Sequence, residues 1–253
     1  MTDMPSPPAF LNRPDGQRLA YAHLSGSDTA PGLLFCGGFR SDMTGTKALA
    51  LEAAARARGR ACTRFDYFAH GQSSGDFSQG SIGRWLADTL AVLDQVTTGP
   101  QILIGSSMGG WLATLAALAR PARCAGLVLI APALDFTEAL MWAQMTPAQR
   151  AVLERDGVLR EPSQYFDQPY EYFHHLIVEG RQHLLLDQPI PLACPVRILQ
   201  GMNDPDVPWQ HALRTIQAFS GGDVRLTLLK DGDHRLSRPE DIALLIETVF
   251  GLA

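Results

Sequence analysis

The stretch ILIGSSMGG, residues 102–110, decides the fold expected for this 253-residue chain. An apolar run typical of a buried strand leads into it, and a helix-length stretch at 108–119 follows it. Gly-x-Ser-x-Gly between a strand and a helix is the pattern of a nucleophile elbow, a tight turn that exposes its central serine. Side chains at Gly105 and Gly109 would collide with neighbouring backbone in such a strained turn. Ser107 is therefore the predicted nucleophile, and Ser106 should point elsewhere.

Outward from this stretch, short apolar runs alternate with helix-length stretches. The runs are 33–36, 61–65, 102–104, 127–130, 196–199 and 224–229, and the helix-length stretches are about 43–58, 82–96, 108–119, 207–218 and 239–250. Continuous apolar strands separated by helices predict an α/β fold, with a mostly parallel central sheet and helices on both faces. A weakly alternating segment at 17–24, after the turn residues 14–16, predicts a β-hairpin at the start of one domain spanning 1–253.

One interval breaks this rhythm. Between residues 131 and 196 lie far more residues than the dozen or so that a crossover between parallel strands requires. Its amphipathic segments predict two or three short helices, which we interpret as a small helical lid inserted at about 134–191 over the carboxyl edge of the sheet. Trp142, Met145 and Phe166 are predicted to face the pocket. The alternative for each lid aromatic is that it belongs to the lid's own small core.

A serine hydroxyl needs a base that removes its proton and an acid that orients that base. After a nucleophile elbow the acid follows a later strand, and the histidine comes nearest the C-terminus. Asp204 follows the run 196–199 and is the predicted acid. Asp206 stays an alternative, although a cap on the helix starting near residue 207 is its favoured role. His234, in the loop after the last strand, is the predicted base.

Attack on an acyl carbon places negative charge on oxygen, which two backbone N–H groups can stabilise. The N–H of Met108, at the start of the helix after Ser107, is one predicted donor. The N–H of Phe39 is the other, because the Gly37-Gly38 pair before it lets the backbone approach the substrate; a plain Gly-Gly turn is the alternative. Arg40 lies beside this loop. It is predicted either to bind an anionic substrate or to be a solvated surface charge. The turn-rich loop 66–73 is predicted to flank the pocket.

Composition excludes several classes of function. A formal net charge of −5 leaves no basic footprint for nucleic acid or an anionic membrane. No apolar run approaches the roughly 18 residues of a membrane span. The four cysteines have no CxxC spacing, so we expect free, buried thiols and neither zinc nor a redox motif. The first residues show no cationic and apolar leader, and a cytoplasmic setting is the default expectation.

Taken together, the elbow, the Gly-Gly-Phe loop and the segments 66–73, 201–209 and 233–235 resemble the α/β-hydrolase superfamily over nearly the whole chain. More closely, MTGTKA at 43–48, RFDY at 64–67, PQIL at 100–103 and PIP at 189–191, ahead of Cys194-Pro195, resemble the group of the mitochondrial palmitoyl-protein thioesterase that also deconjugates acyl glucuronides. The resemblance implies S-depalmitoylation or ester cleavage, a hydrophobic acyl slot and a triad of Ser107, Asp204 and His234. The chain departs from that group in showing no organelle-targeting leader and in its lid composition.

The predicted function is hydrolysis of a carboxylic ester or thioester through an acyl-enzyme, without a metal or organic cofactor. The substrate is a small-molecule ester or an acyl thioester, S-acylated proteins included, and an apolar acyl group is favoured. The same triad also supports lactone opening, carbon–carbon bond hydrolysis and perhydrolysis. A non-catalytic binding module is the alternative from another class, and the presence of all three triad residues in order argues against it.

Overall fold

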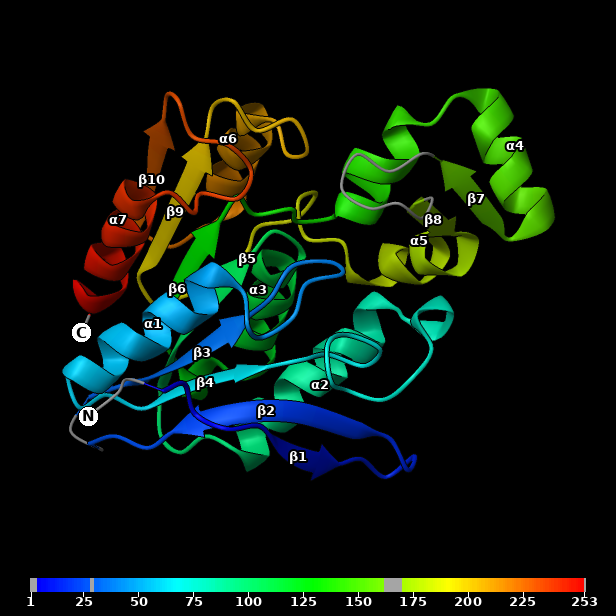
Figure 1. Ribbon diagram of the computed structural model, residues 1–253. Coiled ribbons are helices and arrows are strands. Elements are labelled where there is room, and N and C mark those ends of the chain that lie inside the picture. Colours follow the sequence, from blue (N-terminus) through cyan, green and yellow to red (C-terminus); the bar gives the residue numbers. More distant parts are fainter. Residues whose placement is uncertain (1–3, 28–29, 162–169, 253) are drawn as a thin grey trace.

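A computed structural model describes residues 4–27, 30–161 and 170–252. Its main sheet has eight strands in the order β1-β2-β4-β3-β5-β6-β9-β10 (Figure 1). The strands from β4 to β10 in that order run parallel, and β2 pairs antiparallel with both of its neighbours, β1 and β4. This architecture confirms the predicted α/β class. The strands are β1 Ala9–Asn12, β2 Arg18–Leu24, β3 Gly32–Cys36, β4 Cys62–Phe65, β5 Gln101–Ser106, β6 Cys124–Ile130, β9 Val196–Gly201 and β10 Val224–Leu229.

Helices cover both faces of this sheet, as predicted. Helices α1 (Thr46–Ala57) and α7 (Pro239–Phe250) pack on one face, and α2 (Ile82–Gln95), α3 (Met108–Ala119) and α6 (Trp209–Ala218) pack on the other. Alternate residues of each central strand enter the two cores: in β3, Leu33 and Phe35 face one layer, and Leu34 and Cys36 face the other. Because both faces are buried, these strands are apolar throughout. The short 3-10 helices Phe77–Gln79 and Pro121–Arg123 lie in the connections.

The predicted helix starts at 43 and 207 are each too early. The segment before α1 is a turn in which Gly45 N–H bonds the Asp42 carbonyl, and α1 begins only at Thr46. Helix α6 begins at Trp209 because Pro208 before it is extended. The first hairpin is present, with β1 paired antiparallel to β2.

The strand order brings distant loops to one edge. Strand β3 lies between β4 and β5, and Cys36 at its end pairs with Gly105 near the end of β5. On the other side of β5, Ile130 at the end of β6 pairs with Leu199 of β9. Carboxyl ends of parallel strands therefore meet at one edge of the sheet, and the loops after β3, β4, β5 and β9 emerge there together.

The segment 134–191, called the insertion below, connects β6 to β9 and forms a lobe beside the sheet (Figure 1). Two or three short helices were predicted here. The described part of the insertion has the α-helices α4 and α5 and three shorter helical turns, and the antiparallel pair β7–β8 was not predicted. The alternating aromatics of YEYF in β8 were the available signal. A role as a lid stays a prediction. The elements are η3 Thr137–Met141, η4 Trp142–Gln144, α4 Pro147–Asp156, β7 Val158–Glu161, β8 Tyr170–Phe173, α5 His174–Gly180 and η5 Arg181–His183.

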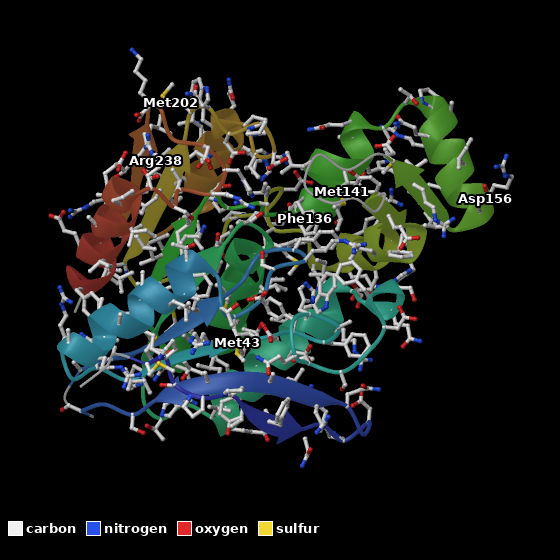
Figure 2. The ribbon with its side chains drawn as sticks, in the orientation of Figure 1. Met43, Phe136, Met141, Asp156, Met202 and Arg238 are labelled. Atoms are coloured by element: carbon white, nitrogen blue, oxygen red, sulfur yellow. The ribbon has the colours of Figure 1, made fainter. Side chains whose placement is uncertain are left out.

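Phe136 and Met141 lie where the insertion joins the main body (Figure 2). The Phe136 ring packs edge-on against Trp111 of α3, with 5.8 Å between centroids, and Trp111 Nε1 donates to the His183 carbonyl at 3.0 Å. Both ends of the insertion are thus attached to the helix that follows Ser107. Within the described ranges, every helix is too short or too polar to cross a membrane.

Candidate active site

Ser107 stands alone between β5 and α3 with φ 55° and ψ −121°. A non-glycine residue rarely adopts a positive φ, so this backbone is strained and must be held by its surroundings. Ser107 N–H donates to the Ile130 carbonyl, and the Ser107 carbonyl accepts from Gly110 N–H, both at 2.9 Å. A Cβ on Gly105 would overlap the Gly109 backbone, and one on Gly109 would overlap the backbone of β3 and its loop. The predicted reason for both glycines is confirmed.

His234 lies between Ser107 and Asp204. Its Nε2 is 3.2 Å from Ser107 Oγ, and its Nδ1 is 2.8 Å from Asp204 Oδ2. Because a carboxylate only accepts, Nδ1 carries the proton and Nε2 is left to accept from the serine hydroxyl. The Asp204 side chain is fully buried, whereas that of His234 is 23% exposed. The structure therefore brings the three predicted residues together in a hydrogen-bonded chain.

Lys47 of α1 forms hydrogen bonds with the loop that carries His234. Its Nζ donates to the carbonyl of Arg235, the residue directly after His234, and lies 3.5 Å from Ser237 Oγ. Burial lowers the pKa of Lys47 to about 8. Sequence reasoning did not single out this lysine, because nothing local relates α1 to a loop almost two hundred residues later.

Asp204 receives four hydrogen bonds, two on each oxygen. Oδ1 accepts from the N–H groups of Asp206 and Val207, both at 2.8 Å, and Oδ2 accepts from His234 and from Gln200 Nε2 at 3.1 Å. These four donors fix the orientation of the carboxylate. Gln200 is fully buried in β9. It was not predicted from the sequence, although a polar residue inside an apolar strand was a signal that could have identified it.

Asp206 was the alternative acid and the expected helix cap. The contact with His234 is made by Asp204, and the cap position of α6 is Pro208, without a side-chain hydrogen bond. Within the part of the chain that is described, Asp204, Asp206 and His234 also form the one cluster whose atoms could ligate a metal, all lying within 4.8 Å. Both Asp204 oxygens are already acceptors, so the cluster fits an acid that orients a histidine.

The loop after β3 reaches Ser107. A Cβ on Gly38 would lie 3.4 Å from Ser107 Cβ, and Gly38 also begins a turn in which Ser41 N–H donates to its carbonyl at 3.1 Å. Phe39 and Arg40 are the central residues of this turn, and Arg40 has a φ of 57°. Met108 begins α3, where the first N–H groups of a helix are left without intrahelical acceptors. Phe39 and Met108 as oxyanion donors stay a prediction.

His70, in the loop after β4, holds this turn. Its Nε2 accepts from Arg40 N–H at 3.2 Å, and its Nδ1 donates to the Phe68 carbonyl at 3.0 Å. Burial lowers the pKa of His70 to about 4, so the ring is neutral at ordinary pH and Nε2 remains an acceptor. The loop 66–73 therefore contacts the turn after β3 directly, and its place beside a substrate pocket stays a prediction. Strands β3 and β4 pair in parallel, which brings the loops after them together and explains this contact.

An aromatic cluster surrounds the same turn. The Phe39 ring lies 5.1 Å from Phe77, 5.9 Å from Trp85 and 5.7 Å from Phe136, measured between centroids. The Arg40 guanidinium stacks 4.0 Å over the Phe77 ring. This stacking places the Arg40 side chain on an aromatic surface, and its contact with substrate stays a prediction.

The other predicted substrate contacts lie in the insertion. Met145 is buried with Leu153, Leu159 and Ile177 in a small core of the insertion, and Trp142 packs against that core. The guanidinium groups of Arg150 and Arg181 lie 4.9 and 5.1 Å from Trp142 ring centroids. These contacts favour the alternative that the lid residues form their own core. Phe166 lies outside the described residues.

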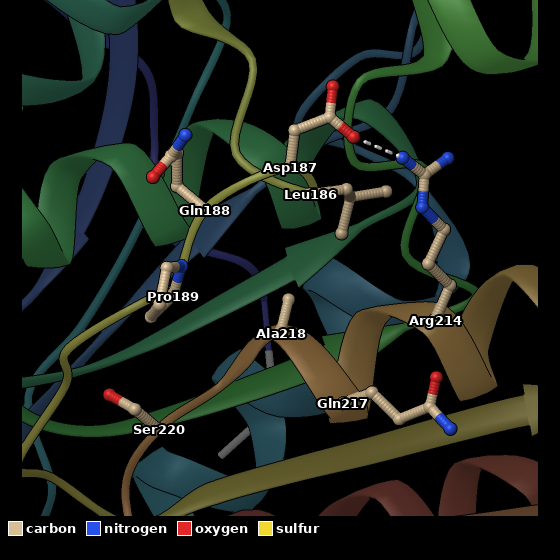
Figure 3. Close-up of a pocket in the computed structure, with 8 residues that line it drawn as sticks. All are labelled: Leu186, Asp187, Gln188, Pro189, Arg214, Gln217, Ala218 and Ser220. Atoms are coloured by element: carbon tan, nitrogen blue, oxygen red, sulfur yellow. Dashed lines mark hydrogen bonds and ion pairs between the residues drawn. The ribbon is translucent and has the colours of Figure 1, made fainter.

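A groove of about 470 Å³ lies elsewhere, between residues 186–189 and the C-terminal half of α6 (Figure 3). An ion pair of 2.7 Å between Asp187 and Arg214 crosses its rim. Its eight lining residues include none of the predicted site residues. We therefore place the candidate active site at Ser107 and not in this groove.

The comparison with protein families is decisive for the class of the protein. The model of the alpha/beta hydrolase family matches residues 33–243, which include Ser107, Asp204 and His234. The chain is an α/β hydrolase. Among curated relatives of this hydrolase, the palmitoyl-protein thioesterase ABHD10 of Homo sapiens is 41% identical over 96% of the chain and 79% of the relative, and that of Mus musculus is 42% identical over 96% and 82%.

Solved structures agree with this membership. A putative hydrolase from Agrobacterium vitis has a TM-score of 0.93 and 41% identity, with 98% of this chain and 99% of that chain covered. Mouse alpha/beta hydrolase domain-containing protein 10 has a TM-score of 0.90 and 39% identity, with 98% of each chain covered. The group predicted from the sequence is confirmed, and these relatives support a hydrolase with thioesterase-type activity.

The expected cytoplasmic setting is wrong by the same comparisons. That expectation relied mainly on the pattern of the first residues. The curated relatives, 40–42% identical to this hydrolase, are all named as mitochondrial. A few terminal residues carry less information about location than similarity over 96% of the chain.

Proposed function

We propose that this α/β hydrolase cleaves acyl thioesters and carboxylic esters with Ser107 as its nucleophile. The observation that carries the proposal is the hydrogen-bonded chain from Ser107 Oγ through His234 to the buried Asp204 carboxylate. A hydroxyl becomes nucleophilic at neutral pH when an oriented base within hydrogen-bond reach removes its proton. The strained elbow supports the same role, because it projects the serine side chain out of the sheet.

The proposed reaction has two halves. Ser107 Oγ attacks the acyl carbon while His234 Nε2 takes its proton, and the N–H groups of Met108 and Phe39 stabilise the oxyanion. His234 then passes the proton to the leaving thiol or alcohol, which leaves the acyl group on Ser107. Water, deprotonated by His234, releases the acid and restores the serine. Asp204 stabilises the imidazolium in both halves and, held by Gln200, keeps Nδ1 as the protonated nitrogen.

The proposed substrate carries a long apolar acyl chain. Relatives 40–42% identical are named palmitoyl-protein thioesterases, and their substrate class is the one proposed for this chain. The aromatic cluster of Phe39, Phe77, Trp85 and Phe136 supports this choice, since its half-buried members, Phe39 and Phe77, make the surroundings of the turn after Gly38 apolar. The substrate can be a small acyl thioester or an S-acylated protein.

The test is a matched series of acetyl, octanoyl and palmitoyl thioesters together with p-nitrophenyl esters and an acyl glucuronide. We expect Ser107→Ala to lose about 10³-fold or more in kcat. Ser106→Ala, one position earlier, is the control and should keep kcat within a few-fold. Turnover that survives Ser107→Ala would refute the nucleophile. An optimum at acetyl, or on the glucuronide, would refute the long-chain thioester and leave a small-molecule esterase.

A further inference from the structure

Two of the four cysteines meet, although they are 70 residues apart. Cys124 is the first residue of β6, and Cys194 lies in the segment that leads from the insertion into β9. Their Sγ atoms are 3.5 Å apart, and both thiols are free. The other two cysteines, Cys36 and Cys62, face opposite layers of the molecule. The contact is therefore specific to one pair, and the proposed hydrolysis makes no use of it.

We propose that Cys124 and Cys194 are an oxidation site at which a peroxide converts two thiols into a reversible disulfide. A disulfide has sulfur atoms about 2.05 Å apart, so the two sulfurs must approach by about 1.5 Å. The local backbone favours this approach. The register between β5 and β6 shifts at Cys124, which marks an irregular start of that strand. Cys194 lies outside regular structure, while Leu127 N–H bonds the Pro195 carbonyl and keeps the two segments adjacent.

The two thiols are not equivalent. Cys124 is buried, whereas Cys194 is only half-buried and so is the one that a small oxidant reaches first. The hydrogen bond between the two thiols also lowers the pKa of the Cys194 thiol, while the pKa of Cys124 is raised. A thiolate is the form that reacts with peroxide. Cys194 is thus the reacting thiol, and Cys124 is the thiol that closes the bond.

The chemistry balances with one peroxide. The Cys194 thiolate attacks a peroxide oxygen, the O–O bond breaks, and a sulfenic acid and hydroxide form. The Cys124 thiol then attacks the sulfenic sulfur, the S–O bond breaks, and water leaves as the S–S bond forms. The hydroxide takes up the proton that Cys194 released at the start. Two thiols are oxidised, and one hydrogen peroxide is reduced to two waters.

The position of the cysteine pair predicts how its oxidation affects the stability of the protein and the candidate active site. The bond would close a chain segment from 124 to 194 that contains the entire insertion, which restricts the unfolded chain. The pair also lies at the amino end of β6, since Cys124 pairs with Gln101 at the start of β5, and Ser107 follows the opposite end of β5. Oxidation should therefore stabilise the protein and leave the Ser107–His234 contact intact.

The experiment is thiol counting on the full chain. Purified protein is treated with hydrogen peroxide, denatured, alkylated with N-ethylmaleimide and weighed by mass spectrometry. We expect two adducts after oxidation in place of four, a protein mass lower by about 2 Da before alkylation, and recovery of four adducts after dithiothreitol. Peptide mapping should show Cys124 linked to Cys194.

Single variants separate this pair from a general loss of thiols. Cys194→Ser should keep three adducts after peroxide treatment. Cys124→Ser leaves the Cys194 sulfenic acid without a partner thiol, so it should keep two adducts and show a gain of about 16 or 32 Da on Cys194. The control Cys62→Ser should fall to one adduct. Four adducts in the treated wild type would overturn the proposal. So would, in the wild type, a linked pair other than Cys124 and Cys194, or a gain of about 32 Da on Cys194, the signature of a sulfinic acid formed without closure.

Discussion

The substitution His70→Phe tests whether the loop after β4 controls the turn that carries Phe39, the proposed oxyanion donor. The His70 ring packs among Tyr67, Phe77 and Trp85, with centroids 5.5, 5.3 and 5.3 Å away. Phenylalanine keeps an aromatic ring in this space. It removes the acceptor for Arg40 N–H and the donor to the Phe68 carbonyl.

The expected size of the effect follows from the geometry of the turn. Arg40 has a φ of 57°, a left-handed conformation that costs a non-glycine residue about 1–2 kcal/mol. The hydrogen bond from Arg40 N–H to His70 contributes about 0.5–1.5 kcal/mol, which is enough to offset most of that cost. Without it the turn that carries Phe39 is free to relax. Loss of one oxyanion donor lowers kcat by about 10²–10³-fold, so we expect His70→Phe to lose about 10²-fold.

Steady-state kinetics on a palmitoyl thioester provide the assay. The loss should appear in kcat with KM changed by a few-fold at most, because the donor acts on charge that develops during the reaction. His23→Gln is the matched control, since His23 lies on β2 and is separated from β5 by β4 and β3. Far-UV circular dichroism checks that both variants fold. A folded His70→Phe protein with the kcat of the wild type would refute the reasoning.

Further predictions concern stability and the acid. The pKa of His70 is lowered to about 4 by burial, whereas an unfolded histidine titrates near 6.5. The unfolded chain therefore binds a proton first as the pH falls, and this group should lower the free energy of unfolding by about 3 kcal/mol between pH 6.5 and 4. Urea unfolding at several pH values should show a shallower pH dependence in His70→Phe, and an unchanged one would contradict the assignment. Trp111→Ala removes a fully buried ring that also bonds the His183 carbonyl and should cost about 3–5 kcal/mol; an unaltered melting temperature would rule this out. Asp204→Asn should lower kcat by about 10³–10⁴-fold, while Asp206→Asn should keep it within a few-fold, and the reverse pattern would exchange their roles.

Part of the fold and of the candidate site could be predicted from short-range sequence signals. The two glycines around Ser107 are required wherever a strand turns tightly into a helix, because a Cβ at either position would overlap backbone. The alternation of apolar runs and helix-length stretches predicts a parallel sheet covered on both faces. The order of the proposed triad, Ser107, Asp204 and His234, could be predicted for the same reason, since each of the three follows a recognisable strand.

Only the tertiary structure decided which loops meet. Strand β3 lies between β4 and β5, and this order, set by the crossovers, brings His70 against Arg40 and the Gly38 turn against Ser107. Likewise, the burial of Met145 inside the insertion and the contact between Cys124 and Cys194 depend on how distant segments pack. Local patterns determine the conformation of each segment, whereas its neighbours are determined by the packing of the whole chain, which no short stretch of sequence encodes.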